Sequence, residues 1–96
     1  MKYRLTPAAD RDLLQVFLHS LRTFGRAQAE RYYNSLRAEL VYITEYPQAA
    51  RERKLRRVKA RFHPFGAHVI IYRIDASEIV VLRILHGRQD PPRHLK

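Results

Sequence analysis

The sequence predicts an α+β fold in which an N-terminal strand and an antiparallel helical hairpin precede a three-stranded antiparallel meander, in the order βααβββ. Two observations lead to this prediction. Apolar residues recur at helical spacing through the first half of the chain, and β-branched residues cluster in short alternating runs through the second half. A chain of 96 residues supports one modest core, so we expect a single domain over residues 1–96.

The first half begins with a short strand and a capped helix. Lys2 to Leu5 alternates weakly between polar and apolar side chains. Thr6 and Pro7 then indicate a helix start, because the threonine hydroxyl accepts from a free N–H and proline has no N–H to satisfy. Gly25 ends the helix, since glycine readily adopts a positive φ. The expected core-facing residues of this helix recur at helical spacing: Leu14, Phe17, Leu18 and Leu21.

A second helix is expected from about Arg26 to Tyr46, and Pro47 ends it. Two amphipathic helices joined by a tight glycine turn make an antiparallel hairpin. One apolar stripe runs along the second helix, formed by Ala29, Tyr33, Leu36, Leu40 and Ile43. Four tyrosines on this helix are expected to line the core and a groove: Tyr32, Tyr33, Tyr42 and Tyr46.

Three strands are expected in the second half. The first spans Leu55–Phe62 and has one apolar and one basic face, because the two kinds of side chain alternate. Residues 63–66 are expected as a turn, followed by a strand over His68–Ile74. Residues 75–77 form a short hairpin connection to the most hydrophobic strand, Ile79–Leu85.

Charge is the most informative bulk property. Nineteen Lys and Arg against nine Asp and Glu give a formal net charge of +10. Such a surface attracts nucleic acid, anionic membrane or an acidic protein. The run from Arg51 to Arg61 holds seven basic residues and one acid, Glu52. It is either a solvated edge that discourages sheet-to-sheet aggregation, or a patch that meets DNA or an acidic partner.

Several classes of protein are excluded by what the sequence lacks. Without cysteine there is no disulfide framework, thiolate nucleophile or cysteine-based zinc site. The five histidines have no close metal-ligand spacing, so no metal and no cofactor are expected. The N-terminus has no apolar signal segment, and the longest strongly apolar run, Ile79–Leu82, is too short to span a bilayer. We therefore expect a cytoplasmic protein with neither a membrane partner nor a small-molecule substrate.

Four segments, taken in their order along the chain, resemble those of a known protein family. Residues 3–13 form a strand running into a helix with a polar first turn, and residues 43–47 stop the second helix at a Tyr-Pro pair. Residues 68–74 contain a Tyr-Arg pair within a hydrophobic strand. Residues 79–90 end a strand in Arg-Ile-Leu-His before a Gly-Arg loop and an aspartate. Over essentially the whole chain this order resembles the ParE/RelE superfamily of bacterial toxins.

The resemblance implies a toxin of a type II toxin–antitoxin system, which arrests growth, helps to stabilise plasmids, and is neutralised by a cognate antitoxin. That antitoxin usually wraps an extended or helical C-terminal segment around the toxin. ParE-like members poison DNA gyrase, whereas RelE-like members cut mRNA on the ribosome. Lys59 and Arg61 match basic strand positions of the RelE-like enzymes, but Gln89 replaces a loop arginine and no tyrosine follows Tyr72. We therefore favour the gyrase-directed branch, with DNA in the complex.

In that branch no catalytic residue is expected, because binding alone inhibits gyrase. Arg83 lies in an apolar strand, so it is expected to pair with a carboxylate, either Glu78 or Asp90. The expected partner-binding residues are basic or imidazole side chains: Arg57, Lys59, Arg61, Arg83, His86 and Arg88.

Two alternatives remain open. One is a RelE-like ribonuclease in which Lys59 and Arg61 act with a histidine, His68 and His86 forming an acid–base pair. The other is a simple basic nucleic-acid-binding domain without toxicity.

Overall fold

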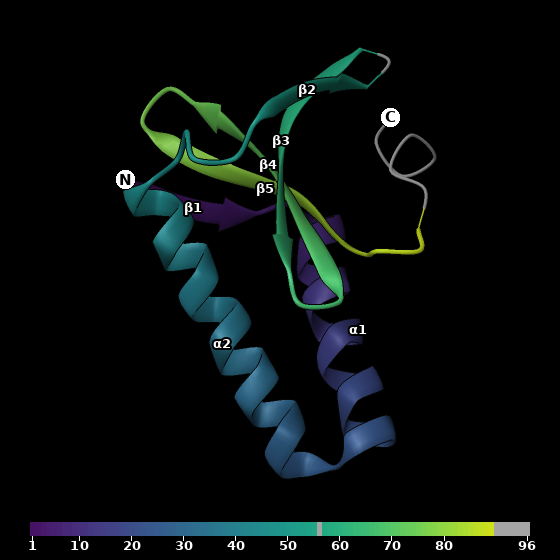
Figure 1. Ribbon diagram of the computed structural model, residues 1–96. Helices are drawn as coiled ribbons and strands as arrows, with labels where there is room; N and C mark the ends of the chain where they lie inside the picture. The colour runs from purple at the N-terminus through teal and green to yellow at the C-terminus, as the bar shows by residue number, and fades with distance from the viewer. Residues whose placement is uncertain (56, 90–96) are drawn as a thin grey trace.

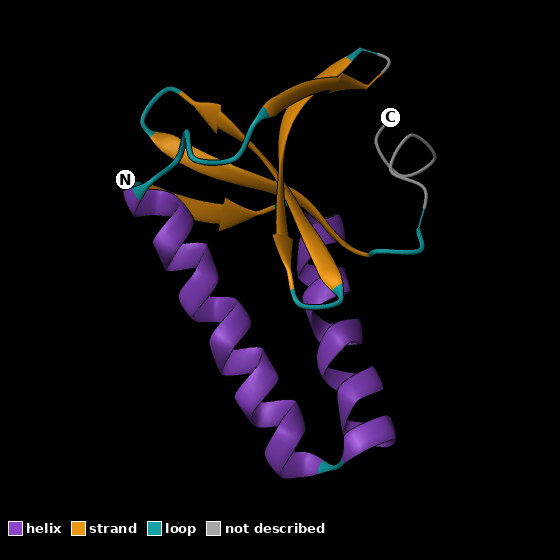
Figure 2. Cartoon of the chain, in the orientation of Figure 1, coloured by secondary structure: helices purple, strands orange, loops and turns teal. Residues whose placement is uncertain are grey.

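A computed structural model describes residues 1–55 and 57–89 of the chain, and it has an α+β architecture. Two helices form a hairpin that packs against one face of a five-stranded sheet (Figures 1 and 2). The turn between the helices lies at the end far from the sheet (Figure 1). In chain order the elements are β1 (Lys2–Leu5), α1 (Pro7–Phe24), α2 (Arg26–Glu45), β2 (Glu52–Leu55), β3 (Val58–Phe65), β4 (His68–Asp75) and β5 (Glu78–His86).

The sheet differs from the expected three-stranded antiparallel meander. Its order is β1-β5-β4-β3-β2, and β1 runs parallel to β5 from Lys2 beside Glu78 to Leu5 beside Val81. The helical hairpin brings the chain back so that its first and last strands are neighbours. The mixed sheet therefore has five strands rather than three.

The bounds of the strand expected over Leu55–Phe62 are also wrong. This segment belongs to a hairpin in which β2 and β3 pair antiparallel, from Glu52 beside Arg61 to Leu55 beside Val58. The sequence between β2 and β3 contains no Gly, Asn or Pro, the residues that usually mark a turn. The alternation of apolar and basic side chains was therefore interpreted as one continuous strand.

Residues 63–66 were expected as a turn, but β3 continues through them to Phe65, and the turn is Gly66-Ala67. Pro64 pairs with Val69 inside this stretch. Proline is tolerated there because β2 pairs with β3 only as far as Arg61, so that edge of β3 needs no N–H donor from Pro64.

The caps of the first helix confirm the sequence analysis. The Thr6 hydroxyl accepts a hydrogen bond from the Ala9 N–H at 3.1 Å, and Pro7 occupies the first helical position. Gly25 adopts a φ of 86° between the two helices, a conformation that a side chain would strain. The two helices therefore begin and end close to the expected residues.

The buried face of α1 is not the expected one. Leu14 is 55% exposed and Leu21 is 37% exposed. The face that packs on the sheet carries small or medium side chains: Ala9, Leu13, Val16 and Ser20. Both stripes have helical spacing, but the smaller residues let α1 lie closer to the sheet. On α2 the expected stripe is confirmed, with Ala29, Leu36, Leu40 and Ile43 buried and Tyr33 half-buried.

The main core lies between the hairpin and the sheet. Buried side chains of α1 and α2 meet a row of strand residues there: Ile70, Tyr72, Ile79, Val81 and Ile84. A second, smaller cluster lies on the opposite face of the sheet, where Ala60, Ile71 and Leu85 are buried. The sheet is therefore apolar on both faces near its centre.

A bulge in β5 is where α1 is attached to the sheet. Ile71 pairs with Arg83 and Tyr72 pairs with Val81, so Leu82 is an extra residue. The Thr6 hydroxyl donates to the Leu82 carbonyl at 2.8 Å. Asp12 accepts from the Ile84 N–H at 2.9 Å. The start of α1 therefore satisfies the polar groups of β5 beyond the end of β1.

Arg83 pairs with Asp12, not with either of the expected carboxylates. Its guanidinium donates to both Asp12 oxygens, at 2.7 and 2.9 Å. These bonds raise the pKa of Arg83, and burial opposes the shift. Glu78 instead accepts from Arg4 at 2.8 Å, and Asp90 lies outside the described residues.

We expect Asp12→Asn to destabilise the protein by about 2–3 kcal/mol, because the amide carries no charge and its NH2 group cannot accept the second hydrogen bond from the Arg83 guanidinium. Urea unfolding monitored by circular dichroism would measure the loss. Glu78→Gln is the matched control, since the exposed Arg4–Glu78 pair should contribute less than about 1 kcal/mol. Equal losses in the two variants would contradict the anchoring role of Asp12.

Ala76 supplies a second stability prediction. It lies in the β4–β5 turn with a φ of 53°, the left-handed region that disfavours a Cβ. Ala76→Gly should therefore raise the unfolding free energy by about 0.5–1 kcal/mol. Ala67→Gly in the β3–β4 turn is the control, because Ala67 has no positive φ to relieve. Matching urea midpoints for wild type and Ala76→Gly would refute the expected strain.

Candidate functional site

The expected basic residues of β3 lie on a projecting hairpin. We call residues 52–55 and 57–61 the basic hairpin, which stands at the edge of the sheet (Figure 1). Arg57 and Lys59 are exposed. Arg61 is half-buried and donates to the Ala50 carbonyl at 2.7 Å, which ties down the segment between α2 and β2. Arg57 and Lys59 are therefore the accessible members of this group.

The hairpin concentrates positive charge on both of its faces. Lys54 and Lys59 are direct cross-strand partners, an arrangement in which like charges repel each other. On the other face, the Arg53 guanidinium lies 4.6 Å from the centre of the Phe62 ring. An anion placed between the two lysines would relieve their repulsion, so this hairpin is suited to a negatively charged partner.

The remaining expected residues lie elsewhere on the sheet. Arg83 is engaged with Asp12, as described above. His86 ends β5, and Arg88 follows in the next turn, both exposed. The Arg88 N–H donates to His86 Nδ1 at 3.2 Å. The structure therefore divides the six expected residues into the basic hairpin, the internal Arg83 pair and the end of β5.

This division separates the residues of the RelE-like catalytic set. His68 begins β4 beside Phe65, the last residue of β3, whereas Lys59 lies six residues earlier along β3. At about 3.3 Å per residue, Lys59 and His68 are roughly 20 Å apart. Lys59 and the histidine pair therefore do not meet at one phosphate.

His68 and His86 themselves do lie together. They are direct partners across β4 and β5, and their rings meet edge to face with centroids 5.5 Å apart. Burial lowers the pKa of His68, and the nearby His86 and His19 lower it further. The Tyr32 hydroxyl lies 2.8 Å from His68 Nδ1. This cluster lines a cavity of about 350 Å³ between α1 and the ends of β4 and β5.

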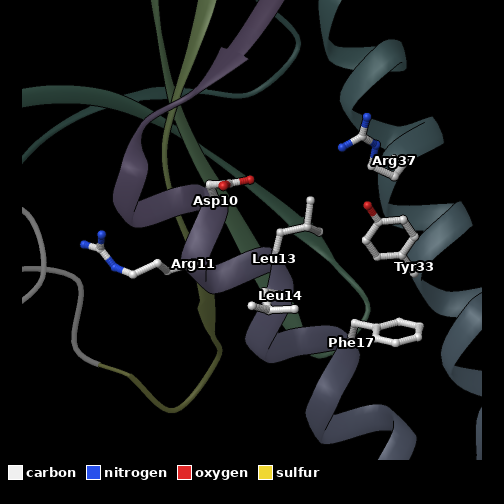
Figure 3. Close-up of a pocket in the computed structure, with 7 residues that line it drawn as sticks. All are labelled: Asp10, Arg11, Leu13, Leu14, Phe17, Tyr33 and Arg37. Atoms are coloured by element: carbon white, nitrogen blue, oxygen red, sulfur yellow. The ribbon is translucent and has the colours of Figure 1, made fainter.

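A groove lies between the two helices, beside α2 as the sequence analysis expected, but the side that α1 contributes was missed. It encloses about 480 Å³, and its apolar lining comes from Leu13, Leu14 and Phe17 of α1 and from Tyr33 of α2 (Figure 3). The Phe17 and Tyr33 rings meet edge to face at 5.7 Å. The signal was present in the sequence as the second stripe of α1, which had been assigned to the core.

Charged side chains surround this apolar lining. Asp10, Arg11 and Arg37 complete the groove, and Asp10 and Arg37 point toward each other across it (Figure 3). The Arg37 guanidinium lies 5.9 Å from the centre of the Tyr33 ring. An apolar strip with two arginines at its rim is suited to an amphipathic helix that carries acidic residues.

The tyrosines of α2 are only partly where they were expected. Tyr32 and Tyr33 are half-buried and line the histidine cluster and the groove, respectively. Tyr42 and Tyr46 were expected in the core or a groove, but they are 43% and 56% exposed. They lie at the C-terminal end of α2, which buries Leu40 and Ile43 instead.

Neither a metal-binding group nor a membrane-spanning helix occurs among residues 1–55 and 57–89. No group of three or more His, Cys, Asp or Glu in this part of the chain is placed to hold a metal ion. Neither described helix has the length and apolarity needed to cross a bilayer.

Comparison with known proteins gives consistent matches. The family model described as the ParE toxin of the type II toxin–antitoxin system parDE matches residues 3–91. Toxin ParE1 of Caulobacter vibrioides is 30% identical over 93 residues, which cover 97% of this chain and 96% of that protein. Toxin ParE1 of Mycobacterium tuberculosis H37Rv is 30% identical over 95 residues, covering 98% of this chain and 97% of that protein.

A solved structure shares the fold. The structure described as the chromosomal ParDE TA system from P. aeruginosa matches with a TM-score of 0.74 and 19% sequence identity. The match covers 90% of this chain and 95% of the other. The likeness therefore extends over both helices and the sheet.

Proposed function

The chain belongs to the ParE toxin family of type II toxin–antitoxin systems, which implies an antitoxin partner, and from this premise we propose that it inhibits DNA gyrase by binding. Its cognate antitoxin neutralises it by covering the groove between α1 and α2. The toxin performs no chemistry of its own in this scheme, and both partners are recognised through surfaces.

The basic hairpin is the observation that carries the gyrase proposal. Gyrase works on DNA, so a protein that traps a gyrase–DNA intermediate benefits from an accessible cationic projection. Arg57 and Lys59 are exposed on such a projection, and the Lys54–Lys59 repulsion favours contact with a phosphate backbone. The formal net charge of +10 adds long-range attraction to the same partner.

The groove between α1 and α2 supports the antitoxin part of the proposal. Leu14 is 55% exposed in the free toxin although it lies beside the apolar side chains of Phe17 and Tyr33. An exposed apolar strip of this kind gains stability when a partner helix covers it. Arg11 and Arg37 at its rim favour acidic residues on that helix.

A ribonuclease remains the second candidate, and it rests on the histidine pair. His68 and His86 face each other at a cavity, an arrangement that can pass protons between a ribose hydroxyl and a leaving oxygen. This candidate no longer includes Lys59, because Lys59 lies roughly 20 Å from His68 along β3. A ribosome-dependent mRNA cleavage assay run beside the gyrase assay separates the two activities.

For the gyrase proposal, purified toxin should cause cleaved gyrase–DNA complexes to accumulate while mRNA on ribosomes stays intact. A double change, Arg57→Glu with Lys59→Glu, should lower this accumulation about tenfold or more, because it replaces attraction for phosphate with repulsion. The matched control reverses two exposed charges on the helices, Arg22→Glu with Arg31→Glu, and should retain most of the activity. Absence of cleaved complexes from a toxin that arrests growth would overturn the gyrase target.

For the antitoxin proposal, Leu14→Glu should weaken binding of the antitoxin about 100-fold, because it puts a carboxylate into an apolar contact. Cells that carry the antitoxin would then still be arrested by the variant. Tyr46→Glu is the control, since Tyr46 is 56% exposed, as Leu14 is at 55%, but lies outside the groove. Calorimetry with the purified antitoxin measures both, and wild-type affinity of Leu14→Glu would exclude this docking site.

A further inference from the structure

The histidine cavity has features that neither gyrase inhibition nor antitoxin binding requires, although the ribonuclease candidate also uses its histidine pair. It lies between α1 and the ends of β4 and β5 and encloses about 350 Å³, near the lower end of the roughly 300–1,000 Å³ typical of small-molecule sites. Three imidazoles reach it from three different elements: His19 from α1, His68 from the start of β4 and His86 from the end of β5. Val16 and Ile84 form its apolar part.

Two of these imidazoles have hydrogen-bond partners at Nδ1 that leave Nε2 available. His86 Nδ1 lies 3.2 Å from the Arg88 N–H, which can only donate, so Nδ1 accepts and the proton sits on Nε2. His68 Nδ1 lies 2.8 Å from the Tyr32 hydroxyl, closer than the 3.4 Å from that hydroxyl to the Phe65 carbonyl. Because the Tyr32 hydroxyl can also donate to the Phe65 carbonyl, His68 Nδ1 either accepts from Tyr32 or donates to it, and in both cases protonated His68 donates through Nε2.

The Tyr32 hydroxyl stays protonated in this role. Burial raises its pKa, and a backbone hydrogen bond to Ala67 opposes the rise only in part. His86 is consequently a hydrogen-bond donor through Nε2 even when it is neutral, and His68 is one when it is protonated. A ring whose Nδ1 is occupied and whose Nε2 carries a proton is a poor metal ligand but a good partner for an oxyanion.

The cavity contains no uncommitted carboxylate among the described residues that line it. Asp12 is its one acidic group, and both oxygens of Asp12 already accept from Arg83 and the Ile84 N–H. Gln89 uses its oxygen to accept from the His86 N–H, which leaves its amide group as a donor. The polar groups that remain available at the cavity, including Gln15, are therefore mostly donors.

We propose that this cavity binds a phosphate group, held by the Nε2–H groups of His68 and His86, with His19 and the Gln89 amide as further donors. The shared chemistry is a tetrahedral oxyanion, which is present in inorganic phosphate, in a terminal phosphate and in a nucleic-acid diester. The proposal does not depend on the gyrase target. Its failure would leave that target and the antitoxin groove untouched.

Binding of the phosphate is coupled to proton uptake. In the free protein His68 is harder to protonate than usual because it is half-buried and faces two other imidazoles, while Asp12 is neutralised by Arg83 and Tyr32 is uncharged. A bound anion offsets the repulsion between protonated imidazoles, so it favours the protonated form of these rings. Affinity for phosphate should therefore increase as the pH falls through the histidine pKa values.

The lowered pKa of His68 also makes the stability of the folded protein depend on pH. Because the folded-state pKa of His68 lies below its unfolded value, the folded protein binds fewer protons in that window. Stability from this source is complete above about pH 6.5 and is lost as the pH falls through the folded-state pKa. Saturating phosphate should restore part of the stability lost at low pH, because it binds the folded protein.

The test is a titration of the full-length isotope-labelled protein with inorganic phosphate, followed by imidazole resonances at about pH 6 and about pH 7.5. Chloride keeps the ionic strength constant, so that general screening of the net charge does not change. Saturable shifts should occur at His68 and His86 and not at His63, with affinity about five- to tenfold higher at the lower pH. Shifts that fail to saturate, or that are equal at all three histidines, would overturn the proposal.

Two variants make the result specific. His86→Gln should weaken phosphate binding about tenfold or more, and it should fold normally because His86 is exposed at the end of β5. His63→Gln is the control, since His63 contacts Glu39 and does not line the cavity. Unchanged affinity in His86→Gln would refute the site, as would saturable shifts with zinc ions in place of phosphate.

The source of the phosphate is identified by two further ligands. A dinucleoside monophosphate offers an internal diester, and a 5′-phosphorylated dinucleotide offers a terminal phosphate. Tighter binding of either ligand than of inorganic phosphate supports a nucleic-acid ligand and names which of its phosphates is held. Tightest binding of inorganic phosphate also supports the site and identifies free phosphate as the ligand.

Discussion

The Asp12 carboxylate is the constraint on which the arrangement of helix and sheet depends. It accepts two hydrogen bonds from Arg83 and one from the Ile84 N–H, beside the bulge that makes Leu82 an extra residue in β5. These groups of β5 lie beyond the end of β1, so β1 cannot satisfy their hydrogen bonds. Asp12 therefore fixes both the position of α1 along β5 and the rotation of α1 about its own axis.

That rotation decides which surfaces the protein offers. With Asp12 facing β5, the stripe containing Leu13 and Val16 faces the core, and Leu14 is left beside α2 at the groove. The same helix face places His19, two turns after Asp12, at the mouth of the histidine cavity. One ion pair thus determines the geometry of two candidate binding sites, and its Asp12 also lines the histidine cavity.

The sequence was sufficient for features that local chemistry determines. The Thr6 cap, the Gly25 turn and the buried stripe of α2 were all predicted because each depends on neighbours within a few residues. The buried face of α1 was not predicted, because two stripes had equal spacing and the choice depends on Asp12 meeting Arg83, 71 residues away. The parallel β1–β5 pairing and the β2–β3 hairpin likewise depend on distant contacts or on a turn without marker residues. For the site, the basic run and a groove beside α2 were predicted, but the α1 side of that groove was missed because Leu14 was expected in the core.

The distances between the surfaces constrain how neutralisation can work. The basic hairpin and the histidine cavity lie at opposite ends of β3, roughly 20 Å apart at the usual rise per residue. The groove lies between the helices, so a helix docked there does not itself cover Arg57 or Lys59. An antitoxin that blocked gyrase by contact alone would need a second segment that reaches the hairpin. Acidic residues on that segment would meet the cations of the hairpin. On the proposed function, the groove therefore provides affinity, and the charge of the connected segment provides inhibition.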